Sequence, residues 1–213
     1  MTWSGGDDVT ERREDMKGFA AAAVTTATLL AVSLADAGSA AAEPDSHPLD
    51  RLVALVADRL DTADTVAAVK WAAAAREGTE PVIDDPAREA RIYEAMARLG
   101  AERGLPEPWV RQVFAGQIEA NKIVQRGLVE RWRAGLAAAP VPATDLAGVR
   151  PVIDRANVEI VEQLAAHRAE LSAPGCATDL AESVLDTMPA RNADAVYRVA
   201  LVRASFGLCA TPS

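Results

Sequence analysis

Three short segments rich in Gly and Pro divide residues 43–213 into long stretches without a strand pattern. The segments are Gly78-Thr79-Glu80-Pro81, Gly104-Leu105-Pro106-Glu107-Pro108 and Ala139-Pro140-Val141-Pro142. Each one ends a helix, because Gly favours the left-handed cap and Pro lacks the N–H that would continue the helix. No stretch between them alternates apolar and polar residues with a period of two, as a half-buried strand would. The sequence therefore predicts an all-α fold.

We expect about six helices, which extend from about 49 to 77, 85 to 103, 108 to 135, 146 to 171, 177 to 187 and 191 to 207. The composition agrees with this, because 50% of the residues are apolar but only 4% are aromatic, and Ala and Leu favour helices. The three long helices of 43–139 are expected to form the core of a binding site. Residues 140–213 are expected to form a C-terminal helical half of the same single domain.

Residues 1–42 are expected to be a signal peptide. Met16-Lys17-Gly18 precedes an apolar run over 19–35, and Ala40-Ala41-Ala42 follows. A positive start, an apolar stretch and an A-x-A cleavage site are typical of a secretory signal. Residues 1–15 carry both charge signs and suit a signal poorly, so we expect translation to begin at Met16. A retained membrane anchor is the weaker alternative, since the run is short and rich in Ala and Thr. The protein is therefore expected to be secreted or periplasmic, cleaved after about Ala42, without membrane contact afterwards.

Cys176 and Cys209, the two cysteines of the chain, are expected to form a disulfide. An even cysteine count in an exported chain favours this pairing, and closing a loop of about 34 residues typically contributes roughly 3–4 kcal/mol. Two buried free thiols are the alternative. The two Cys and two scattered His residues lack metal-ligand spacing, so we expect no metal site.

The formal net charge of -9 argues against a nucleic-acid surface, which needs a basic face. It leaves a small anionic ligand open, if a few basic side chains point inward from an acidic shell. The ligand class therefore depends on where the basic residues fall on the predicted helices.

Two cations lie on the apolar face of the first predicted helix. Arg59 and Lys70 share this face with Leu52, Val56 and Ala63. They are eleven residues apart, close to three turns, so both point in the same direction. Two like charges on a buried face are costly unless an anion meets them. The alternative is that their stems snorkel and carry the charges to water, and this helix alone favours neither interpretation.

The second predicted helix carries charged residues at its start. Arg88 lies in the first turn, where the helix dipole disfavours a cation, beside Glu89 and the predicted N-cap Asp85. The two acidic residues would complement the dipole without any further function. The helix dipole therefore accounts for the two acidic residues but does not account for Arg88.

The third predicted helix carries three amides, Gln117, Asn121 and Gln125, at positions i, i+4 and i+8. Buried amides need hydrogen-bond partners. Either they satisfy one another or a neighbouring helix, or they face the same ligand as the cations of the first two helices.

Together these residues describe an anion-binding pocket that lacks a nucleophile. The sequence contains no Ser-His-Asp set, no Cys-His pair and no phosphate loop, and His47 and His167 are expected to be incidental. Such a pocket suits a reaction in which the enzyme positions a small dianion and stabilises separated charge.

The same residues lie in fragments whose order and spacing are specific, although each fragment alone is weak. The fragments are Arg59-Leu60 with Ala63, Val69-Lys70-Trp71, Ile83-Asp84-Asp85-Pro86-Ala87-Arg88-Glu89, Val113-Phe114 through Gln117-Ile118 to Asn121 and Gln125, and Arg150-Pro151-Val152-Ile153-Asp154. By these fragments the chain resembles the all-helical chorismate mutases, specifically their exported subclass. The likeness continues through both cysteines to Phe206.

The resemblance implies an enzyme that rearranges the dianion chorismate to prephenate without a cofactor or a metal. Arg59 and Arg88 would hold the two carboxylates of chorismate, and Asn121 would help to orient one of them. Glu89 would accept a hydrogen bond from the ring hydroxyl, and Asp85 would support the site as well as cap its helix.

For the chemical step, the resemblance implies that Lys70 and Gln125 donate hydrogen bonds to the ether oxygen. This oxygen becomes negative as the C–O bond breaks in a chair-like transition state. Catalysis would then rest on holding the reactive conformer and on meeting the developing charge.

One position departs from the subclass, whose members often place a further substrate-binding Arg on the helix after the third break. That position is Glu159 in this sequence. Either another cation (Arg150, Arg155 or Arg168) replaces it, or the carboxylate is held less tightly.

Two other functions stay open. A related anion such as isochorismate would fit the same pocket, with pyruvate lyase activity, and a non-catalytic secreted helical module would act through its surface. The resemblance also allows a homodimer, because relatives in the subclass are commonly dimers with a complete site in each chain. The long first helix offers a candidate interface.

Overall fold

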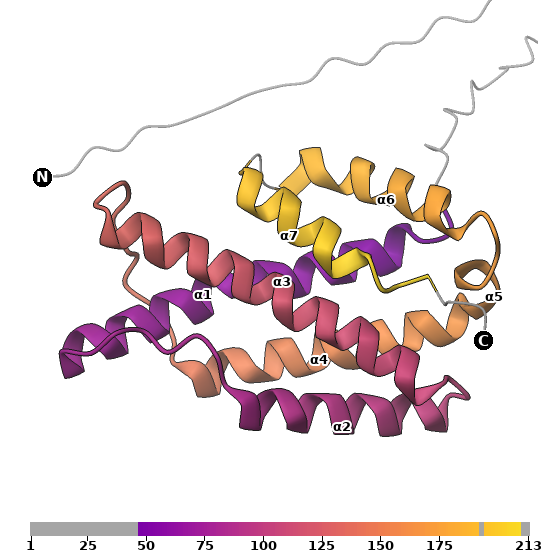
Figure 1. The fold of residues 1–213 in the computed structure, drawn as a ribbon, viewed down its shortest axis with the longest axis horizontal. Coiled ribbons are helices and arrows are strands. Elements are labelled where there is room, and N and C mark those ends of the chain that lie inside the picture. The colour runs from indigo at the N-terminus through magenta and orange to yellow at the C-terminus, as the bar shows by residue number, and fades with distance from the viewer. Residues whose placement is uncertain (1–46, 192–193, 210–213) are drawn as a thin grey trace, which may run out of the picture. The chain divides into compact units, whose positions relative to one another are not determined.

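The computed structural model describes residues 47–191 and 194–209, and every regular element in these ranges is a helix. In chain order the helices are α1 (Asp50–Glu77), α2 (Pro86–Glu102), α3 (Glu107–Arg133), α4 (Leu146–Ala166), α5 (Arg168–Leu171), α6 (Cys176–Arg191) and α7 (Ala195–Ser205). The predicted all-α fold is confirmed (Figure 1). The predicted signal peptide over 1–42 lies outside the described residues. Among the described helices, none combines the length and apolar character needed to cross a membrane.

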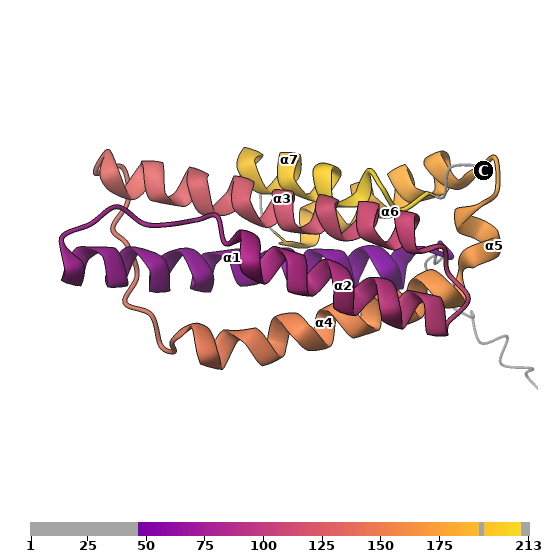
Figure 2. The same ribbon diagram turned by 60° about the horizontal axis from the view of Figure 1, so that its bottom comes forward.

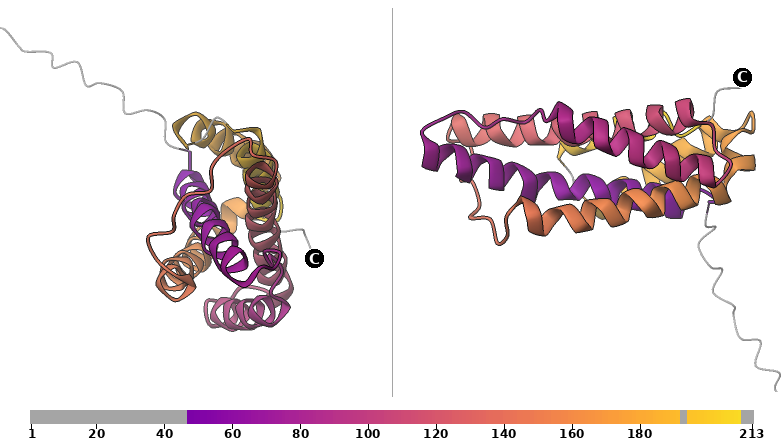
Figure 3. Two further views of the ribbon diagram at one scale, coloured as in Figure 1. Left: turned by 90° about the vertical axis from the view of Figure 1, so that its left-hand side faces the viewer. Right: turned by 90° about the horizontal axis from the view of Figure 1, so that it is seen from below.

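α1 is the central helix and packs against α3, α4, α6 and α7. α2 packs against α3 and α4. The pair α2 and α4 therefore covers one side of α1 and α3, while α6 and α7 cover the opposite side (Figures 1 and 3). The first four helices run along a common long axis (Figure 2). Polar side chains on the inward faces of α1 to α4 are thus brought to one region.

The helix ends follow the signals in the sequence. Gly78 and Gly104, just beyond α1 and α2, adopt left-handed backbone conformations with φ of 68° and 74°, which Gly reaches without strain. α2 begins behind Asp85, whose side chain accepts a hydrogen bond from the backbone N–H of Arg88 at 2.9 Å. The Asp85 cap and the breaks after the first two helices are confirmed.

Seven helices occur in the described ranges where the sequence predicted about six. The predicted fourth helix, 146–171, is two helices, because the chain leaves helical geometry at His167 (φ -106°, ψ 26°). Beyond this break the Arg168 guanidinium donates to the backbone carbonyl of Gly104 at 2.8 Å, and Leu171 is fully buried. These tertiary contacts override the local helical pattern.

The bounds of the last two helices also differ from the prediction. α6 extends to Arg191, beyond the predicted end near 187, and α7 begins at Ala195 instead of 191. Asp194 sets the start of α7, because its side chain accepts a hydrogen bond from the backbone N–H of Val196 at 2.8 Å.

Apolar side chains of α1, α3, α4 and α7 form the core. Leu52, Val56, Phe114, Ile160 and Ala200 are fully buried in it. Burying one large aliphatic or aromatic side chain contributes about 1.5–3 kcal/mol. This core therefore fixes the spacing between the helices whose polar side chains form the site.

A disulfide joins Cys176, at the start of α6, to Cys209, beyond the end of α7, with a Cα–Cα distance of 5.9 Å. The predicted pairing is confirmed, and the alternative of two free thiols is wrong. The bond ties the two C-terminal helices into one unit against α1 and α3.

Replacing both cysteines by serine should lower the free energy of unfolding by about 3–4 kcal/mol, because the loop closed by the disulfide spans 33 residues. Urea unfolding followed by circular dichroism measures the change. Reductant should destabilise the wild-type protein to a similar extent and leave the double variant unaffected. Equal unfolding midpoints for the wild-type protein and the variant would contradict the prediction.

Candidate active site

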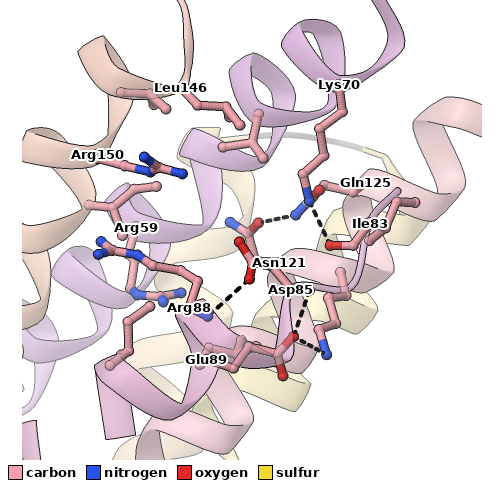
Figure 4. Close-up of a pocket in the computed structure, with 16 residues that line it drawn as sticks. Arg59, Lys70, Ile83, Asp85, Arg88, Glu89, Asn121, Gln125, Leu146 and Arg150 are labelled. Carbon is pink, nitrogen blue, oxygen red and sulfur yellow. Dashed lines mark hydrogen bonds and ion pairs between the residues drawn. The ribbon is translucent and has the colours of Figure 1, made fainter. Parts of the chain in front are cut away.

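A cavity of about 120 Å³ lies among α1, α2, α3, α4 and the α1–α2 loop (78–85). Concave sites of this kind are typical of small-molecule binding. Its polar lining consists of Arg59, Lys70, Asp85, Arg88, Glu89, Asn121, Lys122, Gln125 and Arg150. Its apolar lining consists of Val66, Ile83, Ile92, Ile118, Leu146, Val149 and Ile153. The structure thus brings all seven predicted site residues to one cavity (Figure 4).

Arg59 is a buried cation at the base of the site, with only 3% of its surface exposed. Its Nε donates to Oδ1 of Asn157 at 2.7 Å, and its Nη1 donates to the backbone carbonyl of Gln117 at 3.0 Å. Burial lowers the pKa of Arg59 to about 10, although the nearby Asp154 partly opposes this. The guanidinium stays charged at neutral pH, and the snorkelling interpretation is wrong for this residue.

Lys70 lies three turns further along the same face of α1 and is half-buried. Its Nζ donates to the backbone carbonyl of Ile83, in the α1–α2 loop, at 2.6 Å. Burial lowers the pKa of the Lys70 ammonium, and the nearby carboxylates of Asp85 and Asp84 oppose the shift. The loop backbone therefore sets where this ammonium lies.

The first turn of α2 supplies three charged residues to the cavity. Asp85 accepts from the N–H of Arg88, and its own N–H donates to Oε1 of Glu89 at 3.3 Å. This reciprocal arrangement resembles a capping box and fixes the helix start. The acidic residues therefore complement the helix dipole, as the sequence suggested, and also line the cavity.

Arg88 is stabilised at this unfavourable helix end by a carboxylate from another helix. Its Nη2 donates to Oδ1 of Asp154, on α4, at 2.5 Å. The side chain of Arg88 is 26% exposed and that of Asp154 is 53% exposed, so water and a competing anion can both reach this ion pair. An anionic ligand in the cavity would exchange with Asp154 at one guanidinium.

The three predicted amides of α3 lie in two different environments. Gln117 points away from the cavity and donates to the backbone carbonyl of Ala204, on α7, at 3.0 Å. Asn121 and Gln125 line the cavity and are joined by a hydrogen bond of 2.6 Å from Gln125 Nε2 to Asn121 Oδ1. Both earlier interpretations therefore hold in part: Gln117 satisfies a neighbouring helix, and the other two face the site.

Gln125 keeps unused hydrogen-bonding capacity in the cavity wall. Its Oε1 is buried without a hydrogen-bond partner among the described residues. Its amide nitrogen carries two donors, of which one goes to Asn121. The second N–H of Nε2 is therefore the donor that this amide can offer to a ligand.

Arg150 is the cation that reaches the cavity from α4. Of the other two candidates, Arg168 binds Gly104 at 2.8 Å and Arg155 is exposed and absent from the cavity lining. Glu159 also lies outside the lining and forms an ion pair with Arg51 at 3.1 Å. The acidic residue at 159 therefore adds no charge to the cavity lining.

Lys122 is a lining residue that the sequence pattern did not reveal. It follows Asn121 directly, so it is rotated by about 100° from the amide stripe. Its ammonium lies within 3.0 Å of carboxylate oxygens of Asp84, Glu89 and Glu119. The acidic residue three positions earlier was the one local signal, and the other two partners come from the loop and from α2.

The two histidines lie away from the cavity. His47 contacts Glu182 and Asp186 of α6 at 3.5 and 3.6 Å, and His167 ends α4. Within the described part of the chain, no cluster of three or more His, Cys, Asp or Glu side chains is arranged to hold a metal ion.

The cavity has the opposite charge to the whole chain. Five cationic and two acidic side chains line it, whereas the chain carries a formal net charge of -9. Figure 4 shows Arg59, Arg88 and Arg150 toward one side, with Lys70 and Gln125 toward the other. The site can hold an anion at one end and donate hydrogen bonds at the other.

Comparison with known proteins identifies relatives over nearly the whole chain. Residues 50–126 match the family model described as chorismate mutase type II. The secreted chorismate mutase of Mycolicibacterium smegmatis is 35% identical over 184 residues, which make up 86% of this chain and 98% of that protein. The secreted chorismate mutase of Mycobacterium tuberculosis is 32% identical over 195 residues, or 90% of this chain and 93% of that protein.

Solved structures agree with these sequence relatives. A crystal structure of chorismate mutase from Burkholderia phymatum superimposes with a TM-score of 0.69 at 33% identity, covering 77% of this chain and 97% of that one. A crystal structure of chorismate mutase from Burkholderia thailandensis gives 0.69 at 32% identity, covering 77% of this chain and all of that one. The likeness therefore includes the C-terminal helices beyond the residues that the family model matches.

Replacing Asn157 by alanine should lower the free energy of unfolding by about 1.5–3 kcal/mol, because it leaves a donor of the buried Arg59 guanidinium without its acceptor. Urea unfolding measures the loss. Val158→Ala, at the next and partly exposed position, should change stability by about 0.5 kcal/mol or less. Equal stability for the two variants would show that Asn157 does not support Arg59.

Proposed function

This chain belongs to the chorismate mutase family, and we propose that it rearranges chorismate to prephenate outside the cytoplasm. The observation that carries the proposal is the distribution of charge in the cavity, with three guanidiniums toward one side and the Lys70 ammonium toward the other. Chorismate carries two carboxylates and an ether oxygen that gains negative charge during the reaction. The cavity offers cations for both.

Substrate binding begins with the guanidiniums. Arg59, Arg88 and Arg150 hold the two carboxylates, because planar guanidiniums bind carboxylates through two parallel hydrogen bonds. Asn121 orients one of these carboxylates from α3. Arg88 exchanges its ion pair with Asp154 for the substrate, so this cation has a carboxylate partner both before and after binding.

The rearrangement itself needs no nucleophile and no proton transfer. Within one bound molecule the ether C–O bond breaks as a C–C bond forms, so no group enters or leaves. Lys70 and Gln125 donate hydrogen bonds to the ether oxygen, whose negative charge is largest in the transition state. Donors fixed before the reaction stabilise such developing charge by several kcal/mol, and the chemistry requires neither metal nor cofactor.

Glu89 and Asp85 complete the site at the start of α2. The Glu89 carboxylate accepts a hydrogen bond from the ring hydroxyl and thereby helps to hold the reactive conformer. Asp85 caps the helix that carries both Glu89 and Arg88, so it acts as a support.

Export is supported by observations independent of the cavity. Both sequence relatives are named secreted proteins, and the Cys176–Cys209 disulfide suits an oxidising compartment. A signal peptide over 1–42, cleaved after about Ala42, accounts for that location. Homodimer formation also remains a prediction. The suggested interface is α1, whose C-terminal part, 71–77, is only partly covered by its own protomer.

The deciding experiment follows the loss of chorismate absorbance with the purified protein and identifies the product. Prephenate formation is the expected result. Isochorismate is offered in parallel, and release of pyruvate from it with no turnover of chorismate would replace the mutase by a lyase. Failure to turn over either compound would leave the non-catalytic module as the function.

Replacing Lys70 by alanine should lower kcat about 100- to 1,000-fold, because it removes a donor aimed at charge that develops in the transition state. Initial rates of chorismate loss measure the effect. Arg76→Ala is the matched control, since Arg76 is an exposed cation on the same helix outside the cavity lining, and its rate should equal that of the wild-type protein. Full turnover by the Lys70 variant would disprove the assigned role.

Replacing Arg150 by alanine should raise KM for chorismate about tenfold or more, because a charge-assisted contact to a carboxylate is lost. Glu159→Ala should leave KM unchanged, since Glu159 pairs with Arg51 and does not line the cavity. Steady-state kinetics over a range of chorismate concentrations compare the two variants. A larger change in KM for the Glu159 variant than for the Arg150 variant would contradict the assignment of Arg150 as the α4 residue that binds a substrate carboxylate.

A further inference from the structure

Lys122 is a nearly buried cation in the wall of the cavity, with 8% of its surface exposed. Its ammonium contacts three carboxylates that come from three different elements. Nζ lies 3.0 Å from Oδ1 of Asp84 in the α1–α2 loop, 2.8 Å from Oε1 of Glu89 on α2, and 2.9 Å from Oε1 of Glu119 on α3. This one side chain therefore joins the loop and α2 to α3.

The contacts of Lys122 use its full hydrogen-bonding capacity. An ammonium has three N–H donors and no acceptor, and three carboxylates are within reach. Burial lowers the pKa of Lys122, but the hydrogen bonds to Glu89, Glu119 and Asp84 outweigh burial and leave the pKa above its usual range. Lys122 is therefore charged at neutral pH, and it has no donor to spare for a ligand.

The contact with Glu89 fixes one oxygen of that carboxylate. Both Lys122 and the backbone N–H of Asp85 bind Oε1 of Glu89, at 2.8 and 3.3 Å. A carboxylate held at one oxygen from two directions has little freedom to rotate. The second oxygen, Oε2, keeps its acceptor capacity for a substrate hydroxyl.

The contact with Asp84 acts on Lys70 through the backbone. Asp84 directly follows Ile83, whose carbonyl accepts the hydrogen bond from Lys70 at 2.6 Å. Lys122 and Arg126, both on α3, hold the Asp84 carboxylate at 3.0 Å each. The Ile83 carbonyl, which sets the position of Lys70, therefore lies next to a residue that two side chains of α3 bind.

We propose that Lys122 is a positioning residue for the rearrangement, which it serves by fixing the Glu89 carboxylate and, through Asp84, the carbonyl that orients Lys70. This inference rests on the proposed function. It explains why a cation that lines an anion-binding cavity has all its donors engaged by the protein. One ammonium keeps the hydroxyl acceptor and the ether-oxygen donor in a constant relative arrangement.

Lys122→Met should lower kcat about 10- to 100-fold with a smaller change in KM, because small displacements of catalytic groups affect the transition state most. Lys122→Arg, which keeps the charge, should recover part of the loss. Arg111→Met is the matched control. It removes an equal charge from the same helix, but Arg111 is exposed, pairs with Glu107 at 3.9 Å and does not line the cavity, so kcat should be unchanged.

A double-mutant cycle separates positioning from a general effect on the fold. If Lys122 acts through Glu89, the loss caused by Lys122→Met should shrink at least about threefold when Glu89 is already glutamine. The same shrinkage is expected in the Asp84→Asn background. A purely structural role predicts that the fold-loss in kcat caused by Lys122→Met is the same in the wild-type, Glu89→Gln and Asp84→Asn backgrounds.

The outcomes separate the inference from the proposed function. No chorismate turnover by the wild-type protein overturns the proposed function and the inference with it. An active wild-type protein with unchanged kcat for Lys122→Met, or with the same fold-loss in all three backgrounds, overturns the inference alone. Circular dichroism checks that each variant is folded. If Lys122→Met does not fold, Lys122→Gln takes its place, with the same loss and coupling expected.

Discussion

The burial of the Arg59 guanidinium is the constraint on which the rest of the site depends. A charge removed from water costs several kcal/mol unless polar groups replace its hydration. Here the replacements are neutral oxygens of Asn157, on α4, and of Gln117, on α3, so the same contacts that solvate the cation also join three helices. Because neither acceptor carries a formal charge, the positive charge is left for the cavity. Under the proposed function, a carboxylate of the substrate would complete the solvation of Arg59.

Acidic residues outside the lining hold two of the cations of the cavity in place. Asp154 binds Arg88 from the side of α4, and Asp84 and Glu119 bind Lys122 from behind the cavity wall. A chain with a net charge of -9 can therefore form a cationic site, because most carboxylates lie outside the lining. The net charge of the chain indicated which macromolecular partners to exclude, but the sign of the site depends on which side chains point inward.

Local sequence patterns predicted which residues share one helix face, but they could not predict contacts between segments that are distant in the sequence. Spacing placed Arg59 and Lys70 on one face of α1 and identified Asp85 as a cap, because both properties depend on residues within a few turns. Gln117 shared the amide stripe but meets α7, since a broad stripe on a central helix faces two neighbours. Lys122 escaped notice because two of its three partners are more than 30 positions away in the sequence. The break between α4 and α5 likewise depends on a contact across 64 residues.

The cations at the starts of two helices give an independent reason to expect an anion in the cavity. Arg88 lies in the first turn of α2, where the partial positive charge of the helix N-terminus opposes a cation. Arg150 lies just beyond the first turn of α4. Asp85 and Asp154 reduce this repulsion for Arg88, but the two guanidiniums still face one cavity with Arg59. Under the proposed function, the two carboxylates of the substrate would offset this repulsion. Glu159, by contrast, forms an ion pair with Arg51 at the surface. The resemblance led us to expect an Arg at position 159, but the cation that α4 contributes to the cavity lining is Arg150.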